Sequence, residues 1–339
     1  MSITVYSEPT VFQELAPEWN ELLKRSAGNR IFSTLEWLSH WWQAYHPGDL
    51  WVLAMRDMDN RLIALAPWFI ENHPQYGRVV RSIGCVDVTD YLDLIIDANC
   101  LETVYHHLAD FVAEQNETFD VIDLCNLPEA SPTLKHFTQT LKEVGFSVEI
   151  AQQEVCPIIN LPDTWDGYLA LLNKKDRHEL RRKMRRTENC VETVSWHIVN
   201  EQDDIEAALR RFIELMATSH PDKAKFLADS QNADFFQAIT HAAFERGWLQ
   251  LAFLTVDGTA AAGYLNFDYD GRILVYNSGL LPNEYGHLSP GIVLLGHLIE
   301  QAIDTGHTVF DFLRGDEIYK YRLGGQDTPV FMLRAQLEK

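Results

Sequence analysis

The chain has 339 residues, of which 46% are hydrophobic and 23% charged, and its formal net charge is −21. Because ordinary domains span ~100 to 200 residues, this length predicts two domains. The strong negative charge argues against general binding to nucleic acid, which needs a surplus of Lys and Arg to neutralise phosphates. No apolar run approaches the ~20 residues that cross a bilayer. The early residues also lack the features of a secretion signal, so a cytoplasmic location is expected.

The cysteines and histidines show no spacing typical of a metal or redox site. The five cysteines stand singly, at Cys85, Cys100, Cys125, Cys156 and Cys190. We expect all five to be reduced thiols in the core, because an odd count without a secretion signal does not suggest a disulfide framework. We also predict that the protein binds no metal.

The first half of the chain predicts the order helix, helix, hairpin, strand, helix, strand. The two helices are expected at residues 10–24 and 35–45, where Ser33 or Thr34 can cap the second helix. Strands are expected at 51–56, 62–70, 79–84, 91–96, 121–124 and 147–151, and further helices at 101–115 and 131–144.

The second half repeats this order of elements. A long basic helix is expected at 165–188, followed by helices at 205–219 and 232–246, a hairpin of strands at 249–256 and 260–269, a strand at 271–279, a helix at 290–305 and a strand at 308–313. The recurrence predicts two modules with a shared topology, at residues 1–160 and 161–339.

A short motif at the start of the helix predicted at 290–305 has the features of an anion site. Ser289 is a preferred cap residue, Pro290 suits the first helical position, and Gly291 lets a ligand approach the backbone. The free amides and the dipole of a helix N-terminus both favour phosphate. A charged segment then follows the strand at 308–313, at the kind of strand end where ligands collect.

These residues resemble the FemAB-like and CelD-like branch of the GNAT acyltransferase superfamily. Members of that branch carry a Ser-Pro-Gly helix start, a helix that ends in Gly, and an Asp-Phe-x-x-Gly-x-x-x-Tyr-Lys stretch near the C-terminus. The matching positions here are Ser289, Pro290, Gly291, Gly306, Asp311, Phe312, Gly315, Tyr319 and Lys320.

The resemblance implies an α/β (α+β) fold of two tandem GNAT-like modules, each a mixed central sheet flanked by helices. It implies that the second module holds the acyl donor, acetyl-CoA or another acyl-CoA, with the pyrophosphate at the helix start. The loop departs from the usual Gln/Arg-x-x-Gly-x-Gly/Ala pattern, which leaves other acyl carriers open. The implied donor-binding residues are Leu288, Ser289, Pro290, Gly291, Ile292, Gly279 and Lys320.

Acyl transfer to an amine needs an acid for the leaving thiolate and a route for the amine proton. Tyr319 resembles the GNAT tyrosine that protonates the leaving sulfur, and simple packing is its alternative role. Asp311 either acts as the base or pairs with a neighbouring cation, since an Asp inside a core strand needs a partner. Asp316 and Glu317 are alternative bases, or solvated loop carboxylates.

Three groups of residues are candidates for binding the acceptor. Arg177 and Arg181 share one face of the basic helix, and guanidinium groups suit phosphate or carboxylate. The other candidates precede the Ser-Pro-Gly motif or lie in the first module, and for these packing or edge positions are the alternatives. They are Tyr276, Asn277, Tyr285, Asp90 and Tyr91.

Together these features predict an acyl-CoA-dependent N-acyltransferase, with acetyl as the expected group. The acceptor would be an amino group on a small or sugar-linked polar molecule, reached by direct attack, and the family branch is associated with polysaccharide biosynthesis. A Fem-type enzyme that uses aminoacyl-tRNA is an alternative, although no coiled-coil arm is predicted and the chain is acidic. A non-catalytic module that binds a glycan or a partner is the third possibility.

Overall fold

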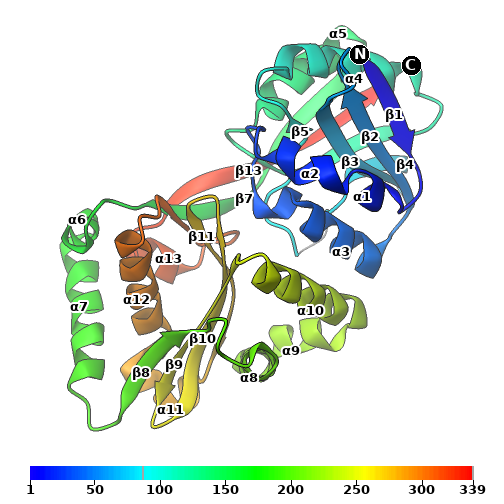
Figure 1. Ribbon diagram of the computed structural model, residues 1–339. Coiled ribbons are helices and arrows are strands. Elements are labelled where there is room, and N and C mark those ends of the chain that lie inside the picture. The colour runs from blue at the N-terminus through cyan, green and yellow to red at the C-terminus, as the bar shows by residue number, and fades with distance from the viewer. Residues whose placement is uncertain (86–87, 338–339) are drawn as a thin grey trace. The chain divides into compact units, whose positions relative to one another are not determined.

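The fold is described from a computed structural model that covers residues 1–85 and 88–337. Contacts divide the chain into two units (Figure 1). Unit 1 comprises Met1–Val155 together with Thr328–Lys339, and unit 2 comprises Cys156–Asp327. The sequence placed the whole of 161–339 in one module, whereas the described residues from Thr328 onward pack in unit 1.

Unit 1 is a mixed sheet with helices on both faces. Its strands follow the order β1-β2-β3-β4-β6-β13, β5 pairs with β3, and the β4–β6 pair is parallel. Its elements are β1 (Ser2–Tyr6), α1 (Val11–Glu14), α2 (Ala16–Leu23), η1 (Ile31–Ser33), α3 (Leu35–Tyr45), β2 (Asp49–Arg56), β3 (Leu62–His73), β4 (Gly77–Ser82), β5 (Ile95–Ile96), α4 (Leu101–Glu114), β6 (Val121–Pro128), η2 (Thr133–Phe137), α5 (Thr138–Glu143) and most of β7 (Phe146–Asn160).

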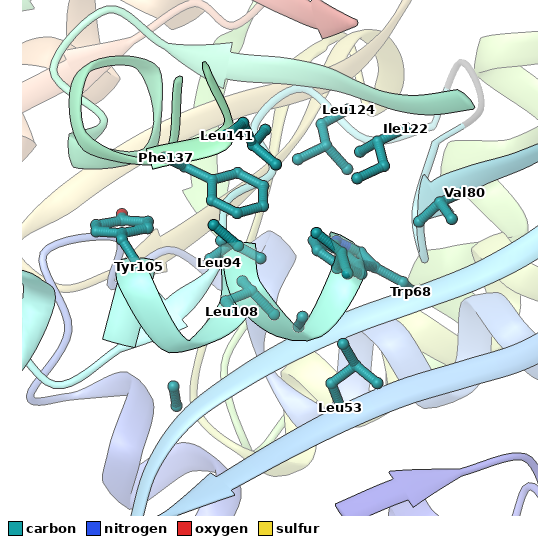
Figure 2. Packing of buried hydrophobic residues seen from close by; sticks show 14 of the residues in the cluster. Leu53, Trp68, Val80, Leu94, Tyr105, Leu108, Ile122, Leu124, Phe137 and Leu141 are labelled. Atoms are coloured by element: carbon teal, nitrogen blue, oxygen red, sulfur yellow. The ribbon is translucent and has the colours of Figure 1, made fainter. Parts of the chain in front are cut away.

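The core of unit 1 lies between its sheet and helices α4 and α5. Figure 2 shows Trp68 of β3, Leu108 of α4 and Phe137 at the start of α5 in this cluster, and all three are nearly or fully buried. On another part of the sheet, the Trp41 ring of α3 lies 5.7 Å from the Phe69 ring of β3. Burying such large rings stabilises the unit mainly through the hydrophobic effect.

Unit 2 repeats this plan. Its strands follow the order β7-β12-β11-β10-β9-β8, and β11 and β12 are parallel. In Figure 1, α7 and α12 lie on one side of this sheet and α8 and α10 on the other. Its elements are α6 (Trp165–Leu171), α7 (Lys174–Glu188), β8 (Val194–Ile198), α8 (Ile205–Ser219), α9 (Pro221–Ala228), α10 (Ser230–Glu245), β9 (Leu249–Val256), β10 (Thr259–Tyr269), β11 (Arg272–Leu280), α11 (Pro282–Tyr285), η3 (Gly286–Leu288), α12 (Pro290–Asp304), β12 (Val309–Asp311), α13 (Ile318–Arg322) and the start of β13 (Gln326–Leu337).

Two long strands belong to both units. The last residues of β7 pair with β12 in unit 2, where Asn160 faces Val309. The strand β13 returns to unit 1, where Val330 faces Pro128 of β6. The sequence identified a short strand at 147–151 and did not predict β13. The expected α/β architecture of two tandem modules is confirmed.

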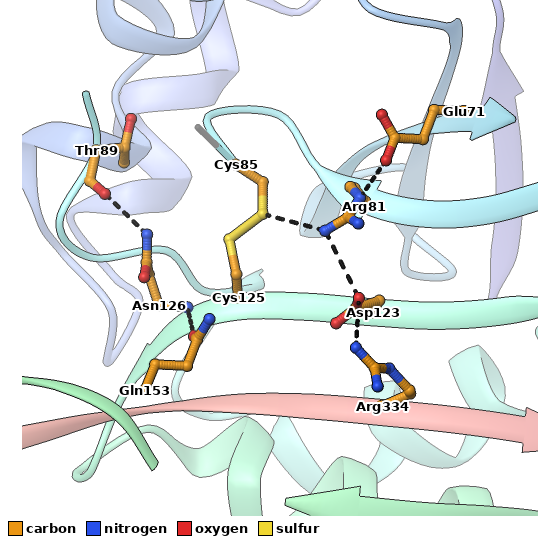
Figure 3. Close-up of a disulfide and its surroundings, with 9 residues drawn as sticks. All are labelled: Glu71, Arg81, Cys85, Thr89, Asp123, Cys125, Asn126, Gln153 and Arg334. Carbon is orange, nitrogen blue, oxygen red and sulfur yellow. Dashed lines mark hydrogen bonds and ion pairs between the residues drawn. A yellow bond between two sulfur atoms is a disulfide. The ribbon is translucent and has the colours of Figure 1, made fainter. Parts of the chain in front are cut away.

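The expectation that all five cysteines are free thiols is wrong. Cys85 and Cys125 form a disulfide, with their Cα atoms 6.3 Å apart (Figure 3). Cys85 follows β4 and Cys125 lies in β6, so the parallel pairing of these two strands brings together residues 40 positions apart. The other three are free. Within the described chain, no helix combines the length and hydropathy that a membrane span requires.

Candidate functional site

Strands β11 and β12 separate after a short parallel pairing. They pair from Arg272↔Val309 to Leu274↔Asp311, whereas β11 continues to Leu280. Within this continuation the pairing register with β10 shifts by one residue. Leu265 faces Asn277, whereas the next residue, Asn266, faces Val275. Tyr276 is therefore a β-bulge, and bulges often occur beside active sites. Because β12 ends at Asp311, the backbone edge of the second half of β11 faces the space beyond the end of β12.

A pocket of about 320 Å³ lies beside this edge of β11. Five of the residues that the sequence proposed line it, namely Ser289, Pro290, Gly291, Ile292 and Tyr319. The sequence did not propose the other lining residues, Lys183, Tyr264, Ser278, Leu280 and Gly286. The Ser-Pro-Gly motif and Tyr319, which follows β12, therefore meet in one pocket.

The first turn of α12 presents free amides to this pocket. Pro290 is the first helical residue, so the amides of Gly291 and Ile292 lie among the helix-start donors that have no intrahelical acceptor. Ser289 precedes them in a left-handed conformation, with φ of 53°. Such a conformation is costly for a residue with a side chain and is typical of functional sites. The expectation that the Ser289 side chain caps the helix is wrong, because its hydroxyl makes no cap bond.

The Ser289 hydroxyl instead accepts a hydrogen bond from Lys183 of α7. The distance from Nζ to Oγ is 3.2 Å. A second contact fixes α7 to the same loop, since Arg186 Nη1 donates to the His287 carbonyl at 2.6 Å. A cation beside a helix N-terminus is unfavourable by itself, because the helix dipole is positive at that end. An anionic ligand would relieve this repulsion, because it would be attracted both to the Lys183 ammonium and to the positive end of the α12 dipole.

Gly291 makes room at the centre of the pocket. A Cβ atom at this position would lie 2.8 Å from Leu280 Cδ2 and 3.4 Å from the Tyr264 hydroxyl. The hydrogen side chain therefore keeps the space between α12 and β10–β11 open, and a ligand can reach the helix-start amides.

Two phenols line the pocket, the buried Tyr264 and the partly buried Tyr319. Burial raises the pKa of Tyr319, and the charge of Glu317 raises it further. Burial also raises the pKa of Tyr264 well above its usual value, with a smaller effect from Tyr319. Both hydroxyls therefore stay protonated at neutral pH, so each is a proton donor and neither is a base.

Asp311, Asp316 and Lys320 do not line the pocket. Asp311 is buried, and its Oδ1 accepts from the Leu313 amide at 2.8 Å. Lys320 Nζ donates to the carbonyls of Leu313, Arg314 and Gly315 at 3.1, 2.7 and 3.1 Å. The same ammonium forms an ion pair with Glu317 Oε2 at 2.9 Å. Asp311 and Lys320 therefore shape the loop that leads to Tyr319, and Asp316 is exposed.

Three residues proposed for the acceptor, Tyr276, Asn277 and Tyr285, and one proposed for the donor, Leu288, pack near the pocket. Tyr276 contacts the rings of Phe236 and Phe267, with centroids 6.3 and 5.1 Å away. Asn277 Oδ1 accepts from the Ser278 amide at 2.9 Å. Leu288 is buried in the hydrophobic core of unit 2, and Tyr285 is partly buried against that core.

Gly279 serves the packing of α8 on the sheet. A Cβ at Gly279 would lie 2.6 Å from the Met216 amide nitrogen. Only glycine permits this close approach of α8 to β11, and the contact fixes the end of α8 over the part of β11 that borders the pocket.

The two arginines proposed for the acceptor both contact residues of α6. Arg177 Nη1 donates to the Leu169 carbonyl at 3.4 Å, and Arg181 lies 3.6 Å from Asp166. Other charged residues of α7 gather around a second, open hollow of about 550 Å³. It is lined by Lys175, Asp176, His178, Glu179, Arg182, Arg185 and Arg322.

Asp90 and Tyr91 lie in unit 1 and are buried. The Arg30 guanidinium is 4.7 Å from the Tyr91 ring centroid, a cation–π distance. The adjacent cavity is only about 20 Å³ and is lined also by Asp93, whose pKa is raised by burial. It has room for a water-sized group.

No cluster of three or more His, Cys, Asp or Glu residues suited to a metal ion occurs among residues 1–85 and 88–337.

Comparison with known proteins finds a family match within the second half of the chain. Residues 174–321 match the family model described as an acetyltransferase (GNAT) domain. A search of curated proteins returns no match. The crystal structure of FemX is similar over 98% of this chain and 97% of that one, with a TM-score of 0.67 and 13% identity.

Two further solved structures have a similar fold. The C-terminal domain of a putative lysylphosphatidylglycerol synthetase from Agrobacterium fabrum covers 95% of this chain and 92% of its own, with a TM-score of 0.55 and 10% identity. L-PGS from Bacillus licheniformis covers the same shares, with a TM-score of 0.54 and 13% identity. At these identities the similarity establishes the fold alone. The chain has a GNAT-like fold, the fold of acyltransferases.

Proposed function

We propose that the chain is an acyl-CoA-dependent N-acyltransferase whose donor binds in the pocket of unit 2. The observation that carries this proposal is the position of Lys183 beside the strained start of α12. There an ammonium group and the amides of Gly291 and Ile292 converge on one pocket. This arrangement suits the pyrophosphate of CoA, and the pocket continues to the edge of β11 and to Tyr319, where the thioester would lie.

The groups around the pocket supply most of what acyl transfer requires. The amine acceptor attacks the thioester carbonyl, and negative charge develops on the carbonyl oxygen. The phenol of Tyr319 lines the pocket and remains protonated, so it donates a proton to the thiolate as it leaves. Direct transfer of this kind needs no covalent enzyme intermediate.

We propose acetyl as the acyl group and an amino group on a small or sugar-linked polar molecule as the acceptor. This part rests on the resemblance of the Ser-Pro-Gly and Tyr-Lys motifs to the FemAB-like and CelD-like branch. Calorimetric titration with acetyl-CoA, butyryl-CoA and decanoyl-CoA measures the preference for acyl length. Thiol release in the presence of a panel of amino sugars then identifies the acceptor. If no acyl-CoA binds at millimolar concentration, the proposed donor is wrong.

A Fem-type transferase that takes its residue from aminoacyl-tRNA is the second candidate. The hollow along α7 favours it, because Arg182, Arg185 and Arg322 present guanidinium groups there in an otherwise acidic chain. Arg182 already pairs with Glu179 at 2.7 Å, which weakens its attraction for phosphate. A binding assay with charged tRNA, with and without Arg185→Glu, separates the two candidates. Tight, salt-sensitive tRNA binding that the variant abolishes would favour this second reading.

A further inference from the structure

A lysine outside the proposed donor site lies against the free edge of β11. Lys223 belongs to α9, and its Nζ donates to the Ser278 carbonyl at 2.5 Å and to the Ser278 hydroxyl at 3.1 Å. Ser278 lines the pocket. Its amide is bonded to the Asn277 side chain, so both polar backbone groups of Ser278 are held by partners other than β10. The ammonium therefore lies at the strand edge beyond the end of β12.

The fold holds α9 in this position. Helix α8 packs directly on β11 at Gly279, and it ends at Ser219. The His220 side chain then caps α9 by accepting from the Asp222 amide at 3.2 Å. Because α8 is fixed to the sheet next to Ser278, the short helix that follows it carries Lys223 to the same strand.

The environment of Lys223 favours its neutral form. Burial lowers the pKa of Lys223 to about 8, and the charge of Glu317, from the loop before α13, opposes this shift only in part. Both hydrogen-bond acceptors come from Ser278, and neither is a carboxylate that would hold a proton on the amine. Lys223 is partly buried, and the neutral fraction of such a lysine is a nucleophile, as in enzymes that form covalent intermediates on lysine.

We propose that Lys223 is a modification site that accepts the acyl group of a thioester bound in the pocket. The inference rests on the proposed donor. The Nζ lone pair attacks the thioester carbonyl carbon, a C–N bond forms and the C–S bond breaks. The sulfur keeps the bonding electron pair, and one amine proton ends on it, so the products are a free thiol and an amide on Lys223. The amide is uncharged and retains one N–H for the Ser278 carbonyl.

Lys225 provides an internal control on the same helix, because it is exposed. Purified full-length protein is incubated with acetyl-CoA at pH 8, and peptide mass spectrometry follows acetylation of both lysines. An ordinary lysine with a pKa of about 10.4 is less than about 1% neutral at this pH, so we expect Lys223 to be acetylated at least ~10-fold faster than Lys225. The rate should rise between pH 7 and 9 as the remaining Lys223 ammonium is deprotonated.

Two further arms distinguish donor-directed acylation from general reactivity. The small thioester S-acetyl-N-acetylcysteamine lacks the phosphates of CoA, so it should acetylate Lys223 more slowly than acetyl-CoA at equal concentration. The Lys183→Met variant should lose this advantage of acetyl-CoA over the small thioester.

The inference fails if acetyl-CoA binds by calorimetry and yet Lys223 is acetylated no faster than Lys225. It also fails if the small thioester and acetyl-CoA acetylate Lys223 equally well. If calorimetry shows no binding of acetyl-CoA, the proposed function itself has failed, and the inference is overturned with it. Lys223→Arg keeps the positive charge and should bind acetyl-CoA normally without gaining the acetylated species.

Discussion

Lys183 and Ser289 are 106 positions apart in the chain and are joined by a 3.2 Å hydrogen bond at the start of α12. The bond places a cation of α7 against the positive end of another helix. That placement costs electrostatic energy without an anion and favours binding of one. The contact therefore connects the basic helix, whose charge was evident from the sequence, with the helix start that the Ser-Pro-Gly motif marked.

Removing the charge at position 183 should weaken donor binding. We expect Lys183→Met to raise the dissociation constant for acetyl-CoA by ~10- to 100-fold, because a charge-assisted hydrogen bond contributes about 1.5–3 kcal/mol. Isothermal titration calorimetry measures the change. Lys174→Met, at an exposed position of the same helix, should leave the affinity unchanged. Equal affinity of wild type and Lys183→Met would remove Lys183 from the site.

Tyr319 and Tyr264 both line the pocket, and their single substitutions assign the proton donor. We expect Tyr319→Phe to lower turnover by ~100-fold, within the range of general acid catalysis, while the affinity for acetyl-CoA stays the same. Tyr264→Phe should affect turnover much less. Thiol release with an acceptor amine measures both. The opposite order of effects would assign proton donation to Tyr264.

His307 links the stability of unit 2 to pH. Its Nε2 lies 2.9 Å from Asp268 Oδ1, and this hydrogen bond raises the pKa of His307 above its ordinary value. A raised pKa stabilises the folded state below the unfolded pKa of about 6.5, and the contribution is lost as pH rises through the folded value.

At pH 5.5 the free energy of unfolding should therefore be higher for the wild type than for Asp268→Asn. The difference should be less than ~1 kcal/mol, because Asp268 is partly exposed. The difference should vanish at pH 8.5. Urea unfolding at the two pH values measures it, and a difference that does not depend on pH would contradict the assignment.

The Cys85–Cys125 disulfide should stabilise unit 1. It closes a loop of 40 residues, for which loop entropy predicts a contribution of about 2–4 kcal/mol. Reductant should lower the free energy of unfolding by this amount, as denaturant titration can measure. Cys125→Ser should be insensitive to reductant. Equal stability of the wild type with and without reductant would show that the bond contributes nothing.

Elements with strong local signals could be predicted from the sequence. The bounds of α3, α8 and β9 match the expected ranges. Both helices have an amphipathic pattern. Of the two expected caps of α3, Thr34 accepts the bond from the Trp37 amide. Asp204, which the sequence analysis did not name, caps α8 by accepting from the Ala207 amide. The strand β8 was missed because most of its side chains are exposed at the sheet edge, so the alternation of buried and exposed residues is absent. Helix α9 was missed because it is short and has no buried residue.

In the candidate site, too, some residues could be predicted from a local motif and others could not. The residues of the helix start and Tyr319 follow from contiguous motifs, and they do line the pocket. Lys183 and Tyr264 come from α7 and β10, and only the packing of the helix and strand brings them there. Asp311 and Lys320 belong to the motif, yet their bonds hold the loop backbone. A motif thus includes both residues that line the pocket and residues that shape the loop beside it.

The central claim is that the start of α12 binds the acyl donor, and calorimetric titration of wild type and Gly291→Trp with acetyl-CoA tests it most directly. The indole would fill the space in front of the Gly291 and Ile292 amides. Gly291→Ala is the matched control, because its methyl group meets mainly the mobile end of Leu280. We predict saturable binding by wild type, weaker but measurable binding by Gly291→Ala, and none by a folded Gly291→Trp. Undiminished binding by Gly291→Trp, or none by the wild type, would contradict the account.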